Sequence, residues 1–408
     1  MVAFCLGSSS SNTDMKPSYF EFQNSVKLLC GELSLERLAN ELQQQGAKAP
    51  MLLTDAVLYK LGTVDTVISS MEAEGCRPAC IFTEIPVDSS LRVVNSIAAL
   101  YRRNQCDALV AVGGGSVIDT AKGVRLVLSQ NTDDILAISG VENLSRGTHI
   151  PFIVVPTTAG TGSECTGVAV IRNDDTGVKM EFLSPFVQPD VAVIDPRMTA
   201  GLPPKATAST GMDALCHAVE ACTCLQANPL SQAYGVAAIR MIASHLVQAT
   251  RKGSDKDARF AMALASTMAG IAFSNSMVGA VHAIGHALGG VCHVPHAVAM
   301  TILLPHVMRY NLSHAAASYA ALLPALVGDE AALNTPTDKR AEAAIEAIVR
   351  LGRELHDACG LPLTLEAAGV PKESFAQVAA VAVNDGALIV NPRAADEQQV
   401  ISILNAAF

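Results

Sequence analysis

The sequence has 408 residues and a formal net charge of −10 at pH 7. This length exceeds what one ordinary core fills, so we expect two domains. Hydrophobic residues make up 50% and charged residues 16%, which argues against extended disorder, and the acidic balance argues against nucleic acid or an anionic membrane as partner.

The N-terminal segment suggests a protein that is neither secreted nor anchored in a membrane. Residues 1–11 lack a basic start and a long apolar run, and no uncharged run of membrane length follows. We expect residues 1–19 to be a flexible leader. The eleven cysteines are odd in number and lack the spacing of a small disulfide scaffold, which favours reduced thiols and a cytoplasmic location.

In the first half, short apolar runs alternate with helical stretches, which is the pattern of a mostly parallel sheet covered by helices. The segments 64–74 and 89–103 carry apolar residues at helical spacing. We therefore predict an α/β domain over residues 20–200. Its expected strands are the apolar runs at 51–54, 79–82, 108–112, 152–155 and 191–194.

The character of the sequence changes after Asp195-Pro196. The chain becomes rich in alanine, loses strand-like runs and shows long periodic segments broken by Gly and Pro. Pro203 and Pro204 could start a helix but would not lie inside one, so we place the boundary near Gly201. Residues 201–408 are predicted to form an all-α domain.

Two turns follow apolar strands in the first domain. The first, Gly113–Ser116, precedes a predicted helix whose N-terminus would favour a phosphate, although an ordinary strand-to-helix turn remains equally open. The second, Pro156–Glu164, offers hydroxyls and flexible backbone. Because ligands bind outside the carboxyl ends of parallel strands, both turns should face one crevice at the edge of a Rossmann-like sheet.

Asp55 directly follows the run at 51–54. Its carboxylate could accept hydrogen bonds from a ribose, and its charge would then oppose a 2′-phosphate and favour NAD over NADP. A helix N-cap before Ala56 is the equally open alternative.

The second domain contains a group of metal-ligand residue types. Asp213 and His217 are four residues apart, so they share one face of a predicted helix. Four further histidines fall within fifteen positions, at His282, His286, His293 and His296. A lone His on an apolar face is usually a core residue, but this clustering favours a site for a divalent ion such as Fe(II) or Zn(II). Cys216, Cys222 and Cys224 lack zinc-finger spacing, and we interpret them as core residues.

Four motifs together resemble the iron-containing (group III) alcohol dehydrogenases, and the similarity covers nearly the whole chain after Phe20. They are Gly-Gly-Gly-Ser-x-x-Asp-x-x-Lys from Gly113, Pro-Thr-Thr-Ala-Gly-Thr-Gly-Ser-Glu from Pro156, Gly-Met-Asp-Ala-Leu-x-His-Ala-x-Glu from Gly211, and His-x3-His-x9-His from His282. The resemblance implies an N-terminal dinucleotide-binding domain and a helical metal-binding domain, with the active site in the cleft between them. A departure is Pro86-Val87-Asp88, where many relatives have Pro-Asn-Pro, which puts one ribose or adenine contact in doubt.

The resemblance also implies the site residues. Its metal ligands fall on Asp213, His217, His282 and His296, and His286 matches a histidine beside the nicotinamide that relays protons. Its cofactor contacts fall on Asp55, Gly114, Gly115, Ser116, Asp119, Thr157, Thr158, Thr166 and Lys179.

The expected function is NAD-linked hydride transfer between a small primary alcohol and its aldehyde, assisted by the metal. Phe273 and Val168 match pocket positions of the family and favour a small aliphatic substrate, and we expect a homodimer or higher homo-oligomer. The alternatives are a zinc-dependent polyol dehydrogenase, a metal-independent reductase of the maleylacetate type on the same fold, and a nonenzymatic metal- or nucleotide-binding protein.

Overall fold

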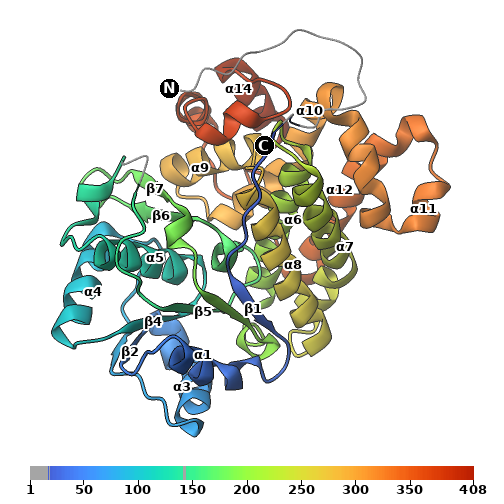
Figure 1. The fold of residues 1–408 in the computed structure, drawn as a ribbon. Helices are drawn as coiled ribbons and strands as arrows, with labels where there is room; N and C mark the ends of the chain where they lie inside the picture. The colour runs from blue at the N-terminus through green and yellow to red at the C-terminus, as the bar shows by residue number, and fades with distance from the viewer. Residues whose placement is uncertain (1–16, 18, 141–143) are drawn as a thin grey trace.

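A computed structural model describes residues 17, 19–140 and 144–408. It has an α/β part built on a sheet, followed by a helical part (Figure 1). Apart from Pro17 and Tyr19, the leader expected over residues 1–19 lies outside the described residues. Strands give way to helices between Ile194 and Pro204, while the domain limits themselves stay a prediction.

Six parallel strands form the central sheet, in the order β1–β8–β5–β4–β2–β3. Strands β2, β4, β5 and β8 are buried on both faces, which explains why their sequences are continuous apolar runs. Every run predicted as a strand is one, and the predicted parallel α/β fold is confirmed. The bounds are Lys27–Cys30 (β1), Pro50–Leu53 (β2), Cys80–Phe82 (β3), Ala108–Gly113 (β4), Phe152–Pro156 (β5) and Val191–Ile194 (β8).

Helices cover both faces of this sheet. Successive residues of a strand point to opposite faces, so Val110 packs with α1 and α3 while Ala111 packs with α4 and α5. The short helix α2 follows β2. The bounds are Leu38–Gln44 (α1), Ala56–Lys60 (α2), Thr63–Ala73 (α3), Leu91–Arg103 (α4) and Gly115–Ser129 (α5).

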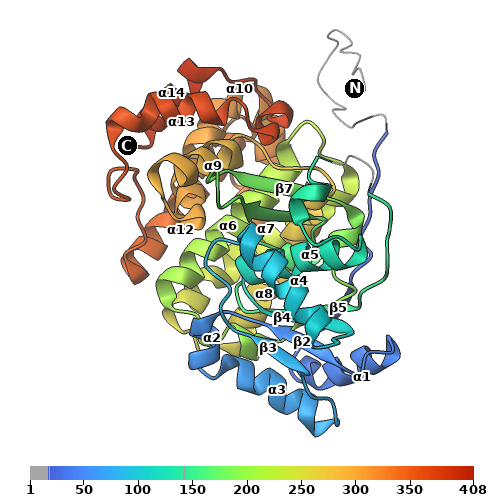
Figure 2. The same cartoon turned by 90° about the vertical axis from the view of Figure 1, so that its left-hand side faces the viewer.

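An antiparallel hairpin, β6 (Val168–Arg172) and β7 (Lys179–Leu183), was not predicted. Its strands are partly exposed and carry charged residues, so they lack the continuous apolar runs of the central sheet. Asp119 on α5 accepts a hydrogen bond from the Val170 backbone N–H at 3.0 Å. Both views show the hairpin between α5 and α9 (Figures 1 and 2), so it lies between the α/β part and the helical part.

Every regular element from Pro204 onward is helical. Pro204 is the first residue of α6, where its missing N–H is not needed. No helix of the described residues is long and apolar enough to cross a membrane. The bounds are Pro204–Thr223 (α6), Pro229–Arg251 (α7), Lys256–Ser274 (α8), Ala280–Cys292 (α9), His296–Val327 (α10), Asp329–Leu333 (α11), Arg340–Cys359 (α12), Phe375–Ala382 (α13) and Glu397–Ala406 (α14).

The two parts meet where the turn after β5 packs on α8. A Cβ atom added to Gly270 would lie 2.7 Å from the backbone oxygen of Gly162, and one added to Gly162 would lie 2.6 Å from the Cα of Gly270. Gly162 also has a φ of +62°, a conformation that favours glycine. The pair of glycines therefore permits a backbone-to-backbone contact that ties the sheet edge to the helical part.

Candidate active site

Three helices bring the predicted metal ligands together. Asp213 and His217 lie one turn apart on α6, His282 lies in the first turn of α9, and His296 is the first residue of α10. The Nε2 atom of His296 lies 3.5 Å from Asp213 Oδ1, and the Nε2 atom of His282 lies 3.9 Å from the same oxygen. Tetrahedral ligands about 2.1 Å from one ion would be about 3.4 Å apart, so these separations fit a shared ion.

Asp213, His217 and His282 form the tightest group. Each offers one ligand atom, and these atoms lie within 4.8 Å of one another. His296 is more exposed, and its placement in the group rests on its distance to Asp213.

Three ligand-type atoms in this group are buried without a hydrogen-bond partner among the described residues. They are Asp213 Oδ1, His217 Nδ1 and His282 Nε2. Leaving one buried polar atom unpaired costs about 1–3 kcal/mol, so three unpaired atoms in one place are an unusual arrangement that a shared ligand would stabilise. The chemistry of the donors, imidazole nitrogen and carboxylate oxygen, fits a divalent cation.

Burial also favours the neutral form of two of these imidazoles. It lowers the pKa of His217 and the pKa of His282 to about 3, because the charged form of each ring would lose its hydration. Both rings are therefore neutral near pH 7, which is the form that binds a metal. The ring of His217 also stacks on Phe273, with centroids 4.4 Å apart.

His286 lies beside this group but has a different environment. Its Nδ1 atom lies 2.8 Å from Asp385 Oδ2, and its side chain is 36% exposed. Burial acts to lower its pKa, but the hydrogen bond and charge of Asp385, with the charge of Glu181, raise that pKa above the usual value. The surroundings of His286 therefore favour the protonated imidazole, whereas those of the neighbouring His282 favour the neutral ring.

The two turns of the α/β part lie side by side, as the parallel strands led us to expect. The Thr157 N–H donates to the Gly113 oxygen at 3.0 Å, and a Cβ atom on Gly114 would lie 3.1 Å from the Thr158 side chain. Strands β2 and β4 are neighbours, and the chain leaves them in opposite directions across the sheet. Their carboxyl ends, which lead to Asp55 and Gly114, thus flank the switch point where such sheets bind ligands.

Several predicted cofactor residues already have partners within the chain. Asp55 is the N-cap of α2, and its Oδ1 accepts from the N–H groups of Val57 and Leu58, each at 2.9 Å. Ser116 donates to the Val87 backbone oxygen. Lys179 donates to Asp88 at 2.9 Å. The segment 86–88, which departs from the family pattern, therefore lies against two predicted cofactor residues, Ser116 and Lys179.

Below the second turn, Asp119 accepts from Ser163 Oγ at 2.7 Å. Thr166 is 1% exposed, and its hydroxyl accepts from Lys122 Nζ at 2.9 Å. Lys122 is itself fully buried and also donates to Ser163 at 2.9 Å. These contacts hold the turn in place, and a direct cofactor role for each residue stays a prediction.

Three further residues near the site, Glu220, Asp385 and Lys122, were not predicted from the sequence. Glu220 and Lys122 stand inside the quoted motifs, so their spacing from His217 and Asp119 was the available signal. Asp385 is 99 residues from His286, and nothing in the local sequence links the two.

Comparisons with known proteins cover almost the whole chain. A family model described as iron-containing alcohol dehydrogenase matches residues 25–196, and one described as the C-terminal part of the Fe-containing alcohol dehydrogenase family matches residues 207–408.

Relatives match along their full length. The chain is 39% identical over 380 residues to a 1,3-propanediol dehydrogenase of Klebsiella pneumoniae, covering 93% of this chain and 96% of that protein. It is 34% identical to the NAD-dependent methanol dehydrogenase of Bacillus methanolicus, covering 92% and 97%. A crystal structure of a 1,3-propanediol oxidoreductase is similar with a TM-score of 0.90 and 37% identity, covering 96% of this chain and 100% of that one.

Proposed function

This chain belongs to the iron-containing alcohol dehydrogenase family, and we propose that Asp213, His217, His282 and His296 hold its divalent ion. It is an NAD-linked oxidoreductase that interconverts alcohols and aldehydes. The observation that carries the metal assignment is the set of buried ligand atoms without partners on α6 and α9. Fe(II) is the ion we propose, and Zn(II) would suit the same nitrogen and oxygen donors.

His286 is proposed as the residue that moves the proton. When bound, the divalent ion supplies Lewis-acid polarisation of an alcohol or carbonyl oxygen, and the nicotinamide supplies hydride exchange. Asp385 holds His286 at Nδ1, so the Nε2 atom is left to accept a proton during alcohol oxidation and to return it during aldehyde reduction. The partial exposure of His286 gives that proton a route to solvent.

The two turns of the sheet edge are proposed to bind the cofactor. The first turn of α5 starts after Gly114, which has no side chain to cap the helix, so its N–H groups and dipole suit a pyrophosphate. Asp55 Oδ1 accepts both capping bonds, so Oδ2 is left for a ribose hydroxyl and capping does not exclude ribose binding. Asp55, Gly114 and Gly115 are proposed to contact the cofactor. The other proposed residues lie around or beneath it and are Ser116, Asp119, Thr157, Thr158, Thr166 and Lys179.

The proposed substrate is a small primary alcohol. Phe273 stacks on His217, and Val168 is the first residue of the hairpin that lies between α5 and α9. Apolar groups at these places favour a short aliphatic chain over a bulky or charged one. Two relatives are named 1,3-propanediol dehydrogenase and methanol dehydrogenase, and the alcohols in these names belong to this class.

We further propose a cytoplasmic location and a homodimer or higher homo-oligomer. All ten cysteines of the described residues are free, which is consistent with a reducing compartment. Cell fractionation and light scattering would test the two proposals separately.

The function is tested with a panel of alcohols and aldehydes. Metal-free full-length protein is loaded with Fe(II) or Zn(II), and NADH formation or consumption is followed for each substrate and cofactor. Turnover of short primary alcohols that depends on added metal is the expected result. Turnover of the whole panel without metal would reject the metal role, and bound metal without any turnover would reject the enzyme assignment.

A further inference from the structure

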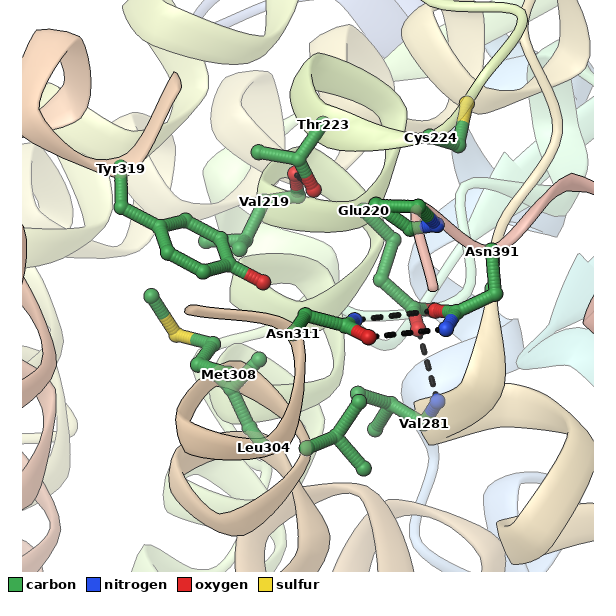
Figure 3. A pocket seen from close by; sticks show the side chains of 13 residues that line it. Val219, Glu220, Thr223, Cys224, Val281, Leu304, Met308, Asn311, Tyr319 and Asn391 are labelled. Atoms are coloured by element: carbon green, nitrogen blue, oxygen red, sulfur yellow. Dashed lines mark hydrogen bonds between the residues drawn. The ribbon is translucent and has the colours of Figure 1, made fainter. Parts of the chain in front are cut away.

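Glu220 links the two helices that carry the proposed ligands. It lies on α6, three residues after His217, and is 6% exposed. Its Oε2 atom lies 2.5 Å from the Nδ1 atom of His282, and its Oε1 atom accepts from the Val281 backbone N–H at 2.7 Å. Figure 3 shows Glu220 extending to the start of α9 at Val281, beside the paired side chains of Asn311 and Asn391.

We propose that Glu220 is a positioning residue for His282. Its carboxylate accepts the proton on Nδ1 and thereby fixes the ring so that Nε2 faces Asp213. The inference rests on the metal role of His282 proposed above and adds a residue that touches neither the ion nor the substrate.

The two nitrogens of a neutral imidazole have different roles. One carries the proton and the other offers a lone pair, and the hydrogen bond at one nitrogen decides which. In His282 the carboxylate of Glu220 lies at Nδ1, whereas Nε2 is buried without a hydrogen-bond partner in the described part of the chain. When the carboxylate accepts the Nδ1 proton, the lone pair is on Nε2, which lies 3.9 Å from Asp213 Oδ1. A carboxylate behind a metal-binding histidine also makes the imidazole a stronger donor.

Glu220 has a second task at the start of α9. The first N–H groups of a helix lack partners within it, and the N-cap Gly279 has no side chain to supply one. Glu220 accepts the N–H of Val281 and so supplies a partner that the helix itself lacks. A Cβ atom on Gly279 would lie 3.1 Å from Glu220 Oε1, so glycine permits this close approach.

Asn391 also caps the start of α9, but its side chain is not the partner of His282, which makes it a matched control. Its Oδ1 accepts from the Ala280 N–H at 3.1 Å, and Asn311 holds its amide through two hydrogen bonds of 3.0 and 2.8 Å. The small cavity beside these residues has about 10 Å³, near the lower limit for one water, so it is a packing gap and not a substrate site. Removing Asn391 should loosen the start of α9 without removing the partner of His282.

The test measures Co(II) affinity of the metal-free full-length protein by competition with a chelator, together with the visible absorption spectrum of bound Co(II). Glu220→Gln keeps the shape of the side chain but removes its charge. We expect this variant to bind Co(II) about 10- to 100-fold more weakly, with a changed spectrum. Asn391→Ala should melt at a lower temperature while its Co(II) affinity and spectrum stay close to those of the unmodified protein.

Three results would overturn the positioning role. The first is an unchanged Co(II) affinity and spectrum in Glu220→Gln, and the second is an equal loss of Co(II) affinity in Asn391→Ala. The third is failure of metal-free Glu220→Gln to fold, which would assign Glu220 to folding alone. His282→Ala tests the proposed metal-ligand role of His282 separately from the positioning role of Glu220. If that variant binds Co(II) as well as the unmodified protein does, the metal assignment itself is wrong.

Discussion

The helical and α/β parts of the active site are built by different means. In the helical part, the proposed metal ligands are side chains on α6, α9 and α10, and the three that lie closest together are buried. At the sheet edge, the central features are glycines and backbone groups of the turns after β4 and β5, while polar side chains such as Asp119 hold the turns in place. The helical part depends on side-chain donor atoms, whereas the sheet edge depends on glycines that have no Cβ atom.

This difference predicts how each region fails. Deleting one of the proposed ligand side chains should disable the helical part without unfolding it, because the removed group is proposed to bind the ion and is not part of the hydrophobic core. Adding a methyl group should disturb the sheet edge, because backbone segments there approach too closely for a Cβ atom. Variants of each kind therefore test whether the two regions respond differently.

The largest effect should come from removing a metal ligand. His282→Ala should lose bound metal and alcohol turnover together, by more than the roughly 10- to 100-fold expected for a residue behind a ligand. Metal content and turnover are measured on one preparation. His293→Asn is the control, since His293 is exposed, has a φ of 57° that Asn tolerates, and is outside the proposed ligand set. Full metal and normal turnover in His282→Ala would refute the assignment.

Removing His286 should cost turnover but not metal. We expect His286→Ala to keep its metal and its melting temperature while turnover falls on the order of 10²-fold, the usual effect of a lost general acid or base. Alcohol oxidation needs the neutral imidazole, so in the unmodified protein it should rise with pH through the pKa of His286, which Asp385 raises.

The pH dependence distinguishes proton transfer from support. The variant should lose that rise, whereas a packing residue would lose stability or metal and keep the same rate per bound metal. An unchanged rate per bound metal with an unchanged pH profile would remove His286 from the mechanism.

The two regions also differ in what their sequences could predict. The α6 ligands follow from a spacing of four residues on one helix, and the buried strands follow from continuous apolar runs. Strand β1, with four residues at the edge of the sheet, and the charged β6–β7 hairpin gave no such signal. Glu220 and Asp385 pair with histidines 62 and 99 residues away, so only the folded chain reveals these contacts.

The next effect is on stability and concerns the contact between Gly162 and Gly270. Gly270→Ala places a Cβ atom 2.7 Å from the Gly162 oxygen, and backbone on both sides cannot easily yield. We expect unfolding free energy to fall by about 1–3 kcal/mol and the KM for NAD to rise, since Gly162 belongs to the proposed cofactor turn. Gly290→Ala on α9 meets nothing within 4 Å and should gain up to about 1 kcal/mol. Equal stability of the two variants would contradict the close-contact argument.

The smallest effect concerns the choice between NAD and NADP at Asp55. The carboxylate has two tasks in the proposed site, since Oδ1 caps α2 and Oδ2 is left for the ribose. Asp55→Asn separates them, because Asn caps a helix about as well as Asp but carries no charge. Stability should therefore stay constant, and kcat/KM for NADP relative to NAD should rise.

The expected size of that rise follows from the partly exposed position of Asp55. Removing repulsion between two charges about 4 Å apart in a water-like environment is worth about 1 kcal/mol, or roughly fivefold in relative kcat/KM. Asp55→Ala loses the cap as well, so it should show the same shift together with lower stability. If the unmodified protein already uses NADP as well as NAD, or if Asp55→Asn leaves the ratio unchanged, Asp55 serves only as the cap of α2.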